Sequence, residues 1–122
     1  MTTHVQLYSE RGVKLTNDRW SWGGMDRHGK VILTVWFDGF RDGAYHFKGR
    51  KADRKATAAV NEVIRLVKHA LHHNNGVVGA IMIHAESTKP GSVRKVAAAR
   101  NVPDMRITSF DEKTGDYTAE WA

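Results

Sequence analysis

The chain has no cysteine among its 122 residues. Disulfide bonds, thiolate metal sites and a cysteine nucleophile are therefore excluded. It also lacks any apolar run long enough to cross a bilayer, and its first twenty residues are polar and mixed in charge, so no signal peptide is predicted. These absences favour a bacterial or phage protein that works in the cytoplasm and has no membrane partner.

Length and composition predict one domain that spans residues 1–122. Apolar residues make up 41% of the chain, which is ordinary for a globular protein. A chain of this length can bury a single core of useful size.

Positive charge is in excess and is unevenly distributed. Nineteen Lys and Arg oppose thirteen Asp and Glu, which gives a net charge of +6. Residues 43–103 carry eleven basic and three acidic side chains, or +8, whereas residues 104–122 carry two basic and five acidic, or −3. A basic middle predicts one positive face, which would attract a polyanion.

The first half of the chain is rich in strand patterns. His4–Tyr8 alternates apolar and polar residues and predicts a short strand, and the alternation restarts at Val13. Arg19–Met25 and Lys30–Asp38 predict the clearest hairpin, because the four residues between them have turn chemistry. The second strand of that hairpin is dense in β-branched and aromatic residues, as is typical of a strand in the middle of a sheet.

The second half predicts a long helix followed by a buried strand. Apolar residues repeat at intervals of three and four from Ala56 to Leu71, in a helix that Asp53 would cap and Gly76 would end. Val77–Ala85 is almost continuously apolar and predicts a central strand beside VILTVWF.

The end of the chain predicts a short helix and a last hairpin. Ser92 would cap the short helix, which ends at Pro103, and Met105–Phe110 would pair with Asp116–Trp121. The predicted fold class is therefore α+β: a curved, largely antiparallel sheet or open barrel with one long helix and one short helix.

Three of the four tryptophans, Trp20, Trp22 and Trp36, lie close together in the sequence. If Met25 opposes Lys30, Trp36 lies on the face opposite the other two, whereas a shift of one residue puts all three on one face. Both registers remain open at this stage. Tryptophans on an open sheet can stack on bases or enclose a flipped base, although packing in the core is their ordinary role.

Two basic clusters complete the candidate interface. Both are expected at helix starts or in loops, where backbone N–H groups and the helix dipole also favour phosphate. A solvated surface is the alternative, but few acidic residues are close in sequence to pair with these charges. The clusters comprise Lys48, Arg50, Lys51, Arg54 and Lys55, and then Lys89, Arg94, Lys95 and Arg100.

Other chemistry is weakly supported. The three histidines between residues 69 and 73 lack further ligands at a metal-binding spacing, so no metal site is predicted. Asp38 and Glu86 end two central strands with Lys89 nearby, as in metal-dependent nucleases, but the spacing is not the usual Glu-x-Lys. No catalytic triad, phosphate loop or dinucleotide fingerprint is present, so neither a catalytic residue nor a cofactor is predicted.

The segment NDRWSWGG followed by KVILTVWFDG, within residues 15–47, resembles the start of small β-rich domains of bacterial and phage restriction systems. The broad class is similar to the PUA-like readers of modified bases, which are curved barrels. The resemblance implies a base cage formed by Trp20, Trp22 and Trp36 and a DNA partner.

The sequence thus predicts a non-enzymatic nucleic-acid-binding domain directed to DNA. Its finer form is a reader of a modified base that acts in restriction or phage–host conflict. The alternative is a phage or mobile-element inhibitor that acts on a host defence complex through protein contacts, because such proteins are also small, basic and free of motifs. A metal-dependent nuclease is the second alternative.

Overall fold

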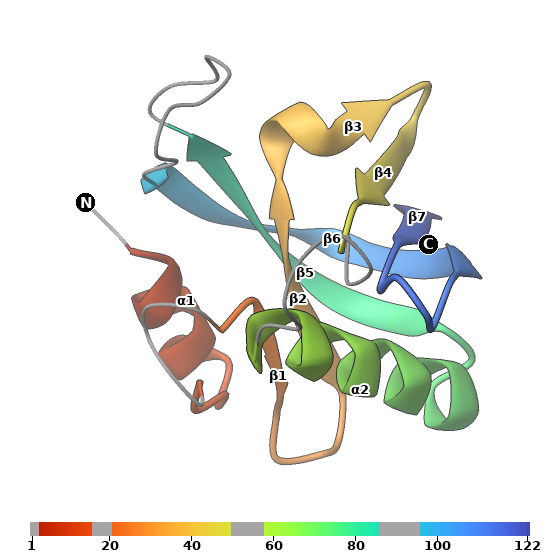
Figure 1. Cartoon of the computed structure of the whole chain (residues 1–122). Helices are drawn as coiled ribbons and strands as arrows, with labels where there is room; N and C mark the ends of the chain where they lie inside the picture. The colour runs from red at the N-terminus through yellow and green to blue at the C-terminus, as the bar shows by residue number, and fades with distance from the viewer. Residues whose placement is uncertain (1–2, 16–20, 50–57, 86–95) are drawn as a thin grey trace.

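Seven strands form one open, mixed sheet in the computed structural model of this chain, in the order β1-β2-β5-β6-β7-β4-β3 (Figure 1). The structure describes residues 3–15, 21–49, 58–85 and 96–122. No helix within these ranges is long and apolar enough to cross a membrane. The elements are α1 (His4–Glu10), β1 (Gly23–Met25), β2 (Val31–Trp36), the 3-10 turn η1 (Phe37–Gly39), β3 (Phe40–Arg41), β4 (Ala44–Phe47), α2 (Ala58–His73), β5 (Val77–Ala85), β6 (Val96–Phe110) and β7 (Tyr117–Trp121).

The predicted fold class is confirmed, with one addition. Every neighbouring pair of strands is antiparallel except β2 and β5, which run parallel from Ile32↔Gly79 to Trp36↔Ile83. Parallel neighbours need a long crossover, and here it contains the β3–β4 hairpin and α2. The apolar run at residues 77–85 forms an interior strand beside VILTVWF, as predicted.

Helix α2 covers one face of the sheet. The alternate residues Val31, Leu33 and Val35 of β2 point into the larger core cluster, together with Val63 and Val67 of α2. The helix stop at Asn75-Gly76 is confirmed: both residues have positive φ, and the Gly76 N–H donates to the Ala70 carbonyl.

The buried stripe of α2 differs in detail from the prediction. Leu71 is 41% exposed, whereas Leu66, Ala70 and Glu62 are buried. The buried face is therefore wider and turned toward residues 62, 66 and 70, because α2 crosses several strands of the sheet. The predicted cap Asp53 and the first stripe residue Ala56 lie outside the described residues.

The prediction of a strand at His4–Tyr8 is wrong, because this segment is helix α1. The helix begins with a capping box, in which Thr3 Oγ1 accepts from the Gln6 N–H and Gln6 Oε1 accepts from the Thr3 N–H. The Thr-x-x-Gln spacing is a helix-start signal that outweighs five residues of alternation. Val13 is buried in an irregular segment and not in a strand.

Helix α1 covers the opposite face of the sheet and forms the second core cluster. Leu7 and Tyr8 pack there against Ile32 and Ile81, the residues that alternate with those facing α2. Tyr8 OH and Thr34 Oγ1 share a hydrogen bond of 2.7 Å in this buried region.

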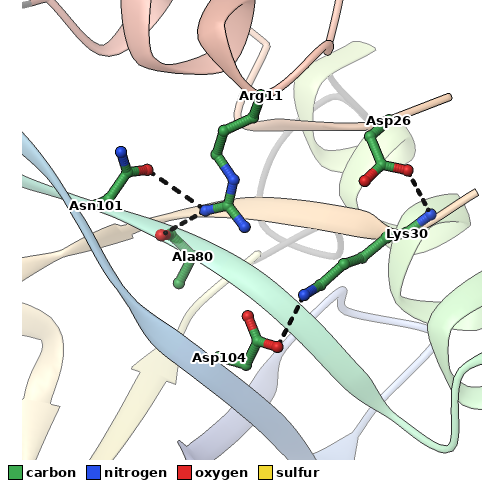
Figure 2. A network of polar contacts seen from close by, with 6 residues as sticks. All are labelled: Arg11, Asp26, Lys30, Ala80, Asn101 and Asp104. Atoms are coloured by element: carbon green, nitrogen blue, oxygen red, sulfur yellow. Dashed lines mark hydrogen bonds and ion pairs between the residues drawn. The ribbon is translucent and has the colours of Figure 1, made fainter. Parts of the chain in front are cut away.

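Arg11 ties the end of α1 to the sheet, as Figure 2 shows. Its Nη1 donates to the Ala80 carbonyl at 3.3 Å and to Asn101 Oδ1 at 3.4 Å. Gly79 makes room for this contact, because a Cβ at that position would lie 2.5 Å from Arg11 Nη2.

The β1–β2 hairpin is confirmed around its predicted turn. Met25 pairs with Val31, so the shifted register holds and not the one in which Met25 opposes Lys30. Burial acts to raise the pKa of Asp26, but the N–H groups of Lys30 and His28 donate to its Oδ1 and lower that pKa overall. The Asp26 carboxylate therefore stabilises the turn (Figure 2).

The prediction of a short helix that ends at Pro103 is wrong within the described residues, because β6 runs from Val96 to Phe110. Its alanines favour a helix locally, but pairing with both β5 and β7 outweighs that preference. Pro103 is tolerated because Pro103 and Asp104 together oppose Gly79 in a bulge, where no ladder N–H is needed. The predicted cap, Ser92, lies outside the described residues.

We expect Val63→Asp to abolish cooperative folding. Val63 is 2% exposed beneath α2, and an unpaired charge there should cost about 4 kcal/mol or more of unfolding free energy. Arg65→Asp is the matched control, because Arg65 is exposed on the same helix. Thermal melts of both variants provide the test, and a Val63→Asp variant that melts like the parent would contradict this assignment of the core.

We expect the folded protein to lose stability above about pH 10. Burial raises the pKa of Tyr8, against the opposing effect of its bond to Thr34, and burial also raises the pKa of Tyr117. Both phenols stay neutral in the folded protein but ionise near pH 10 in the unfolded chain. Their contribution to the free energy of unfolding is therefore complete below about pH 10 and is lost as pH rises through the pKa of the folded state.

Tyrosinate absorbance and circular dichroism, followed through an alkaline titration, should change together. Tyr8→Phe should make the alkaline fall of Tm shallower. Full ionisation of all tyrosines near pH 10 in a protein that stays folded would disprove the prediction.

Candidate nucleic-acid interface

Four of the twelve predicted interface residues lie in the described part of the chain: Trp22, Trp36, Lys48 and Arg100. The other eight lie outside it and comprise Trp20, Arg50, Lys51, Arg54, Lys55, Lys89, Arg94 and Lys95. The four described residues form two groups by their neighbours: Trp22 and Lys48 adjoin Phe47, whereas Trp36 and Arg100 lie on β2 and β6.

Trp22 and Lys48 belong to the first group, through Phe47. The Trp22 ring meets the Phe47 ring edge to face, with centroids 5.8 Å apart. Phe47 ends β4, and the exposed Lys48 follows it directly. Trp22 is half-buried against the core cluster beneath α2, so much of its ring packs against protein.

A hollow of about 240 Å³ lies beside Lys48. Its polar side chains come from β4 and the residue after it, from the end of β6, from β7 and from the β6–β7 loop. A bulge at Thr108 places Thr108 and Ser109 opposite Thr118, and Thr118 Oγ1 makes hydrogen bonds of 2.7 and 2.6 Å with the two hydroxyls. The residues that line the hollow are His46, Phe47, Lys48, Ser109, Phe110, Asp111, Asp116, Tyr117 and Thr118.

The carboxylates at this hollow are already engaged by the protein. Asp116 Oδ1 accepts from the Gly49 N–H at 2.8 Å, and its Oδ2 lies 3.8 Å from Lys48 Nζ. Asp111 Oδ1 accepts from the Lys113 N–H at 2.9 Å. These contacts hold the start of the basic run at residues 48–55 against the β6–β7 loop.

The acidic end of the chain neutralises part of the basic middle. The sequence places few acids near the basic clusters, but folding brings Asp116 to Lys48 of the first cluster and Glu112 to Lys68 elsewhere in the basic middle. In the described ranges, each ion pair joins a lysine to an acid from residues 104–122. The pairs are Lys30–Asp104 at 2.8 Å, Lys48–Asp116 at 3.8 Å and Lys68–Glu112 at 2.7 Å.

Trp36 and Arg100 form the second group. Trp36 lies two residues beyond Thr34, whose backbone N–H donates to the Trp22 carbonyl at 2.9 Å, so Trp36 is near Trp22 at the β1–β2 side of the sheet. The half-buried Trp36 packs against the larger core cluster, and its backbone N–H donates to Tyr45 OH at 3.3 Å. Arg100 is exposed on β6 opposite Met82, and its Nη2 lies 3.4 Å from Met82 Sδ.

Two exposed aromatic residues are not among the predicted interface residues. Phe37 is 55% exposed and stacks on His84 with ring centroids 4.6 Å apart. Trp121 is 44% exposed and stacks on Phe40 at 5.5 Å. Both rings lie at the ends of strands, and the sequence shows no signal that separates such rings from core aromatics.

The elements of the nuclease alternative are only partly described. Asp38 is exposed in η1, and Glu86 lies outside the described residues. Within the ranges that the structure covers, no three His, Asp or Glu side chains gather in a way that could hold a metal ion. His69 and His73 pack together with ring centroids 4.5 Å apart near the end of α2.

We expect Trp22→Ala to lower stability by about 2–4 kcal/mol, because a half-buried ring packed on Phe47 is lost from the core edge. Trp121→Ala is the comparison, and removal of its exposed stack on Phe40 should cost about 0.5–1.5 kcal/mol. Chemical denaturation of both variants gives the two values. An unchanged midpoint for Trp22→Ala would show that this ring is free to stack on a ligand.

Comparison with known proteins adds no relative: no family model, no curated protein and no solved structure matches this chain. The function of this chain must therefore be inferred from the surface of its fold.

Proposed function

We propose that this chain is a non-enzymatic nucleic-acid-binding domain directed to DNA. The observation that carries the proposal is the placement of the excess positive charge. Each basic cluster includes one residue that the structure describes. Lys48 directly follows β4, Arg100 lies on β6, and both side chains are exposed.

The cluster around Arg100 is attached at the junction of β5 and β6. Ala85 and Val96 pair with each other, so the ten residues between them leave and re-enter the sheet at one place. By sequence this connector holds Lys89, Arg94 and Lys95 and a single acid. Three of its residues therefore add positive charge close in the chain to Arg100.

The cluster around Lys48 is attached at the far end of β6. Phe47 pairs with Tyr117, which pairs with Phe110, ten residues along β6 from Arg100. Measured along β6, which contains bulges, this path is at most about 30 Å. Phosphates along one strand of a duplex are about 3.4 Å apart on the helix axis, so a nucleic acid that reached both clusters would span at most roughly nine nucleotides.

The finer proposal is a reader of a modified base in a cytoplasmic restriction or phage-conflict setting. It depends on the resemblance of residues 15–47 to PUA-like readers, with Trp20, Trp22 and Trp36 as the base cage. A binding panel of modified and unmodified oligonucleotides tests it directly.

An inhibitor that acts through protein contacts is the second candidate. The exposed rings of Phe37 and Trp121 favour it, because aromatic residues are enriched in protein interfaces and tryptophan in their hot spots.

We expect affinity for DNA to fall steeply as salt rises, since bound phosphates release counterions. Arg100→Gln and Lys48→Gln should each weaken binding of all sequences alike and reduce the slope of log K against log salt by about one. Arg27→Gln is the matched control, because Arg27 is an exposed cation in the β1–β2 turn, at the other end of β2 from η1.

Fluorescence anisotropy titrations at several salt concentrations measure these slopes. Equal losses in Arg27→Gln would contradict the assignment of the two clusters. Absence of binding at low salt would reject the proposed function.

A further inference from the structure

Phe37 and Trp121 are exposed aromatic residues that each stack on a second ring. Phe37 stacks on His84 with an interplanar angle of 24°, and Trp121 stacks on Phe40 with an angle of 13°. Near-parallel stacking covers one face of each ring with protein and fixes its tilt. Phe37 is nevertheless 55% exposed and Trp121 is 44% exposed, so a large part of each residue is open to solvent.

One short turn brings the two stacks together. Phe37 begins η1 and Phe40 follows its end, so the two residues are three positions apart. A 3-10 turn rises about 2 Å per residue, which places the two backbones about 6 Å apart along the turn. We call Phe37, Phe40, His84 and Trp121 the aromatic corner. Its turn lies at the end of β2 opposite the β1–β2 loop (Figure 1).

Charge at the aromatic corner is mixed. Arg100 pairs with Met82, which lies two residues before His84 on the same face of β5, and Arg41 follows Phe40. In the described ranges no carboxylate lies within ion-pair distance of Arg100. The acids Asp38 and Glu120 are chain neighbours of the two exposed rings, so electrostatic attraction alone would not bind a ligand here.

A ligand that fits the aromatic corner must therefore offer flat faces as well as negative charge. Unpaired bases of a single strand supply the flat faces, and their phosphates can meet Arg100 and Arg41. Duplex bases are already stacked on each other and would gain little from these rings. Base–aromatic stacks contribute about 1–3 kcal/mol per base.

We propose that the aromatic corner binds unpaired bases, so that the protein prefers single-stranded over duplex nucleic acid. This inference rests on the proposed nucleic-acid function and names its substrate class. It concerns rings that are exposed to solvent and is separate from the proposed base cage of Trp20, Trp22 and Trp36.

The test compares a fluorescent single-stranded oligonucleotide with the same sequence as a duplex, at one salt concentration. Phe37→Ala and Trp121→Ala should each lower single-strand affinity about 5- to 150-fold, the equivalent of one lost stack. Duplex affinity should change less than about twofold. Leu71→Ala is the matched control, because Leu71 is an exposed apolar side chain on α2, away from the corner, with 41% exposure.

Thermal melts confirm that each variant is folded before titration. Single-strand and duplex affinities that are equal, or that neither ring substitution changes, would overturn the corner proposal while leaving the salt-dependent function intact. An equal loss in Leu71→Ala would also overturn it. Failure of the parent protein to bind any nucleic acid at low salt would reject the proposed function itself, and the exposed rings would then point to a protein partner.

Discussion

The parallel pairing of β2 with β5 is the constraint on which the rest of the fold depends. Both strands are buried on both faces, so each face needs its own cover. Helix α2 lies in the crossover that parallel strands require and covers one face, and α1 covers the other. The β3–β4 hairpin lies in the same crossover, pairs with β7 and forms the other edge of the open sheet.

The cover by α1 depends on polar contacts as well as apolar ones. Arg11 reaches the Ala80 carbonyl across Gly79, beside the bulge in which Pro103 and Asp104 oppose that glycine. Tyr8 places its hydroxyl against Thr34 in the interior. Buried polar groups stabilise a fold only when they are paired. These contacts therefore fix where α1 lies on the sheet.

The buried face of α2 contains one polar group without such a partner. Glu62 is 5% exposed, and its Oε1 makes no hydrogen bond. The negative charge of Glu62 is among the effects that raise the pKa of Tyr8, after burial itself. Burial is the largest cause of the raised pKa of Tyr8, and it makes the core sensitive to pH at the alkaline end.

The sheet also decides which charges and rings are available to a partner. The acidic last hairpin folds back on the basic middle, and Asp116 and Glu112 engage Lys48 and Lys68. Arg100 stays free of such pairing within the described ranges. The surface that we propose for a ligand is at the η1 end of the sheet, where the stacked rings of Phe37 and Trp121 lie near both basic and acidic side chains.

The elements with strong local signals could be predicted from the sequence. The apolar run of β5, the periodic stripe of α2 and the turns before Val31 and after Phe110 gave the α+β class. The sequence could not predict α1 or the full length of β6 by alternation or helix propensity. Helix α1 forms because its capping box outweighs the alternating pattern of its residues. Strand β6 forms because pairing with β5 and β7 outweighs the helix propensity of its alanines.

Composition alone determined the excess of positive charge and the absence of thiol chemistry, because both depend only on which residues are present. The tertiary structure decided which side chains can meet a ligand. Trp22 and Trp36 pack against the core, whereas Phe37 and Trp121 are exposed at strand ends. Exposure depends on what packs over a side chain from distant parts of the chain, and so only the folded structure could distinguish a core tryptophan from an exposed one.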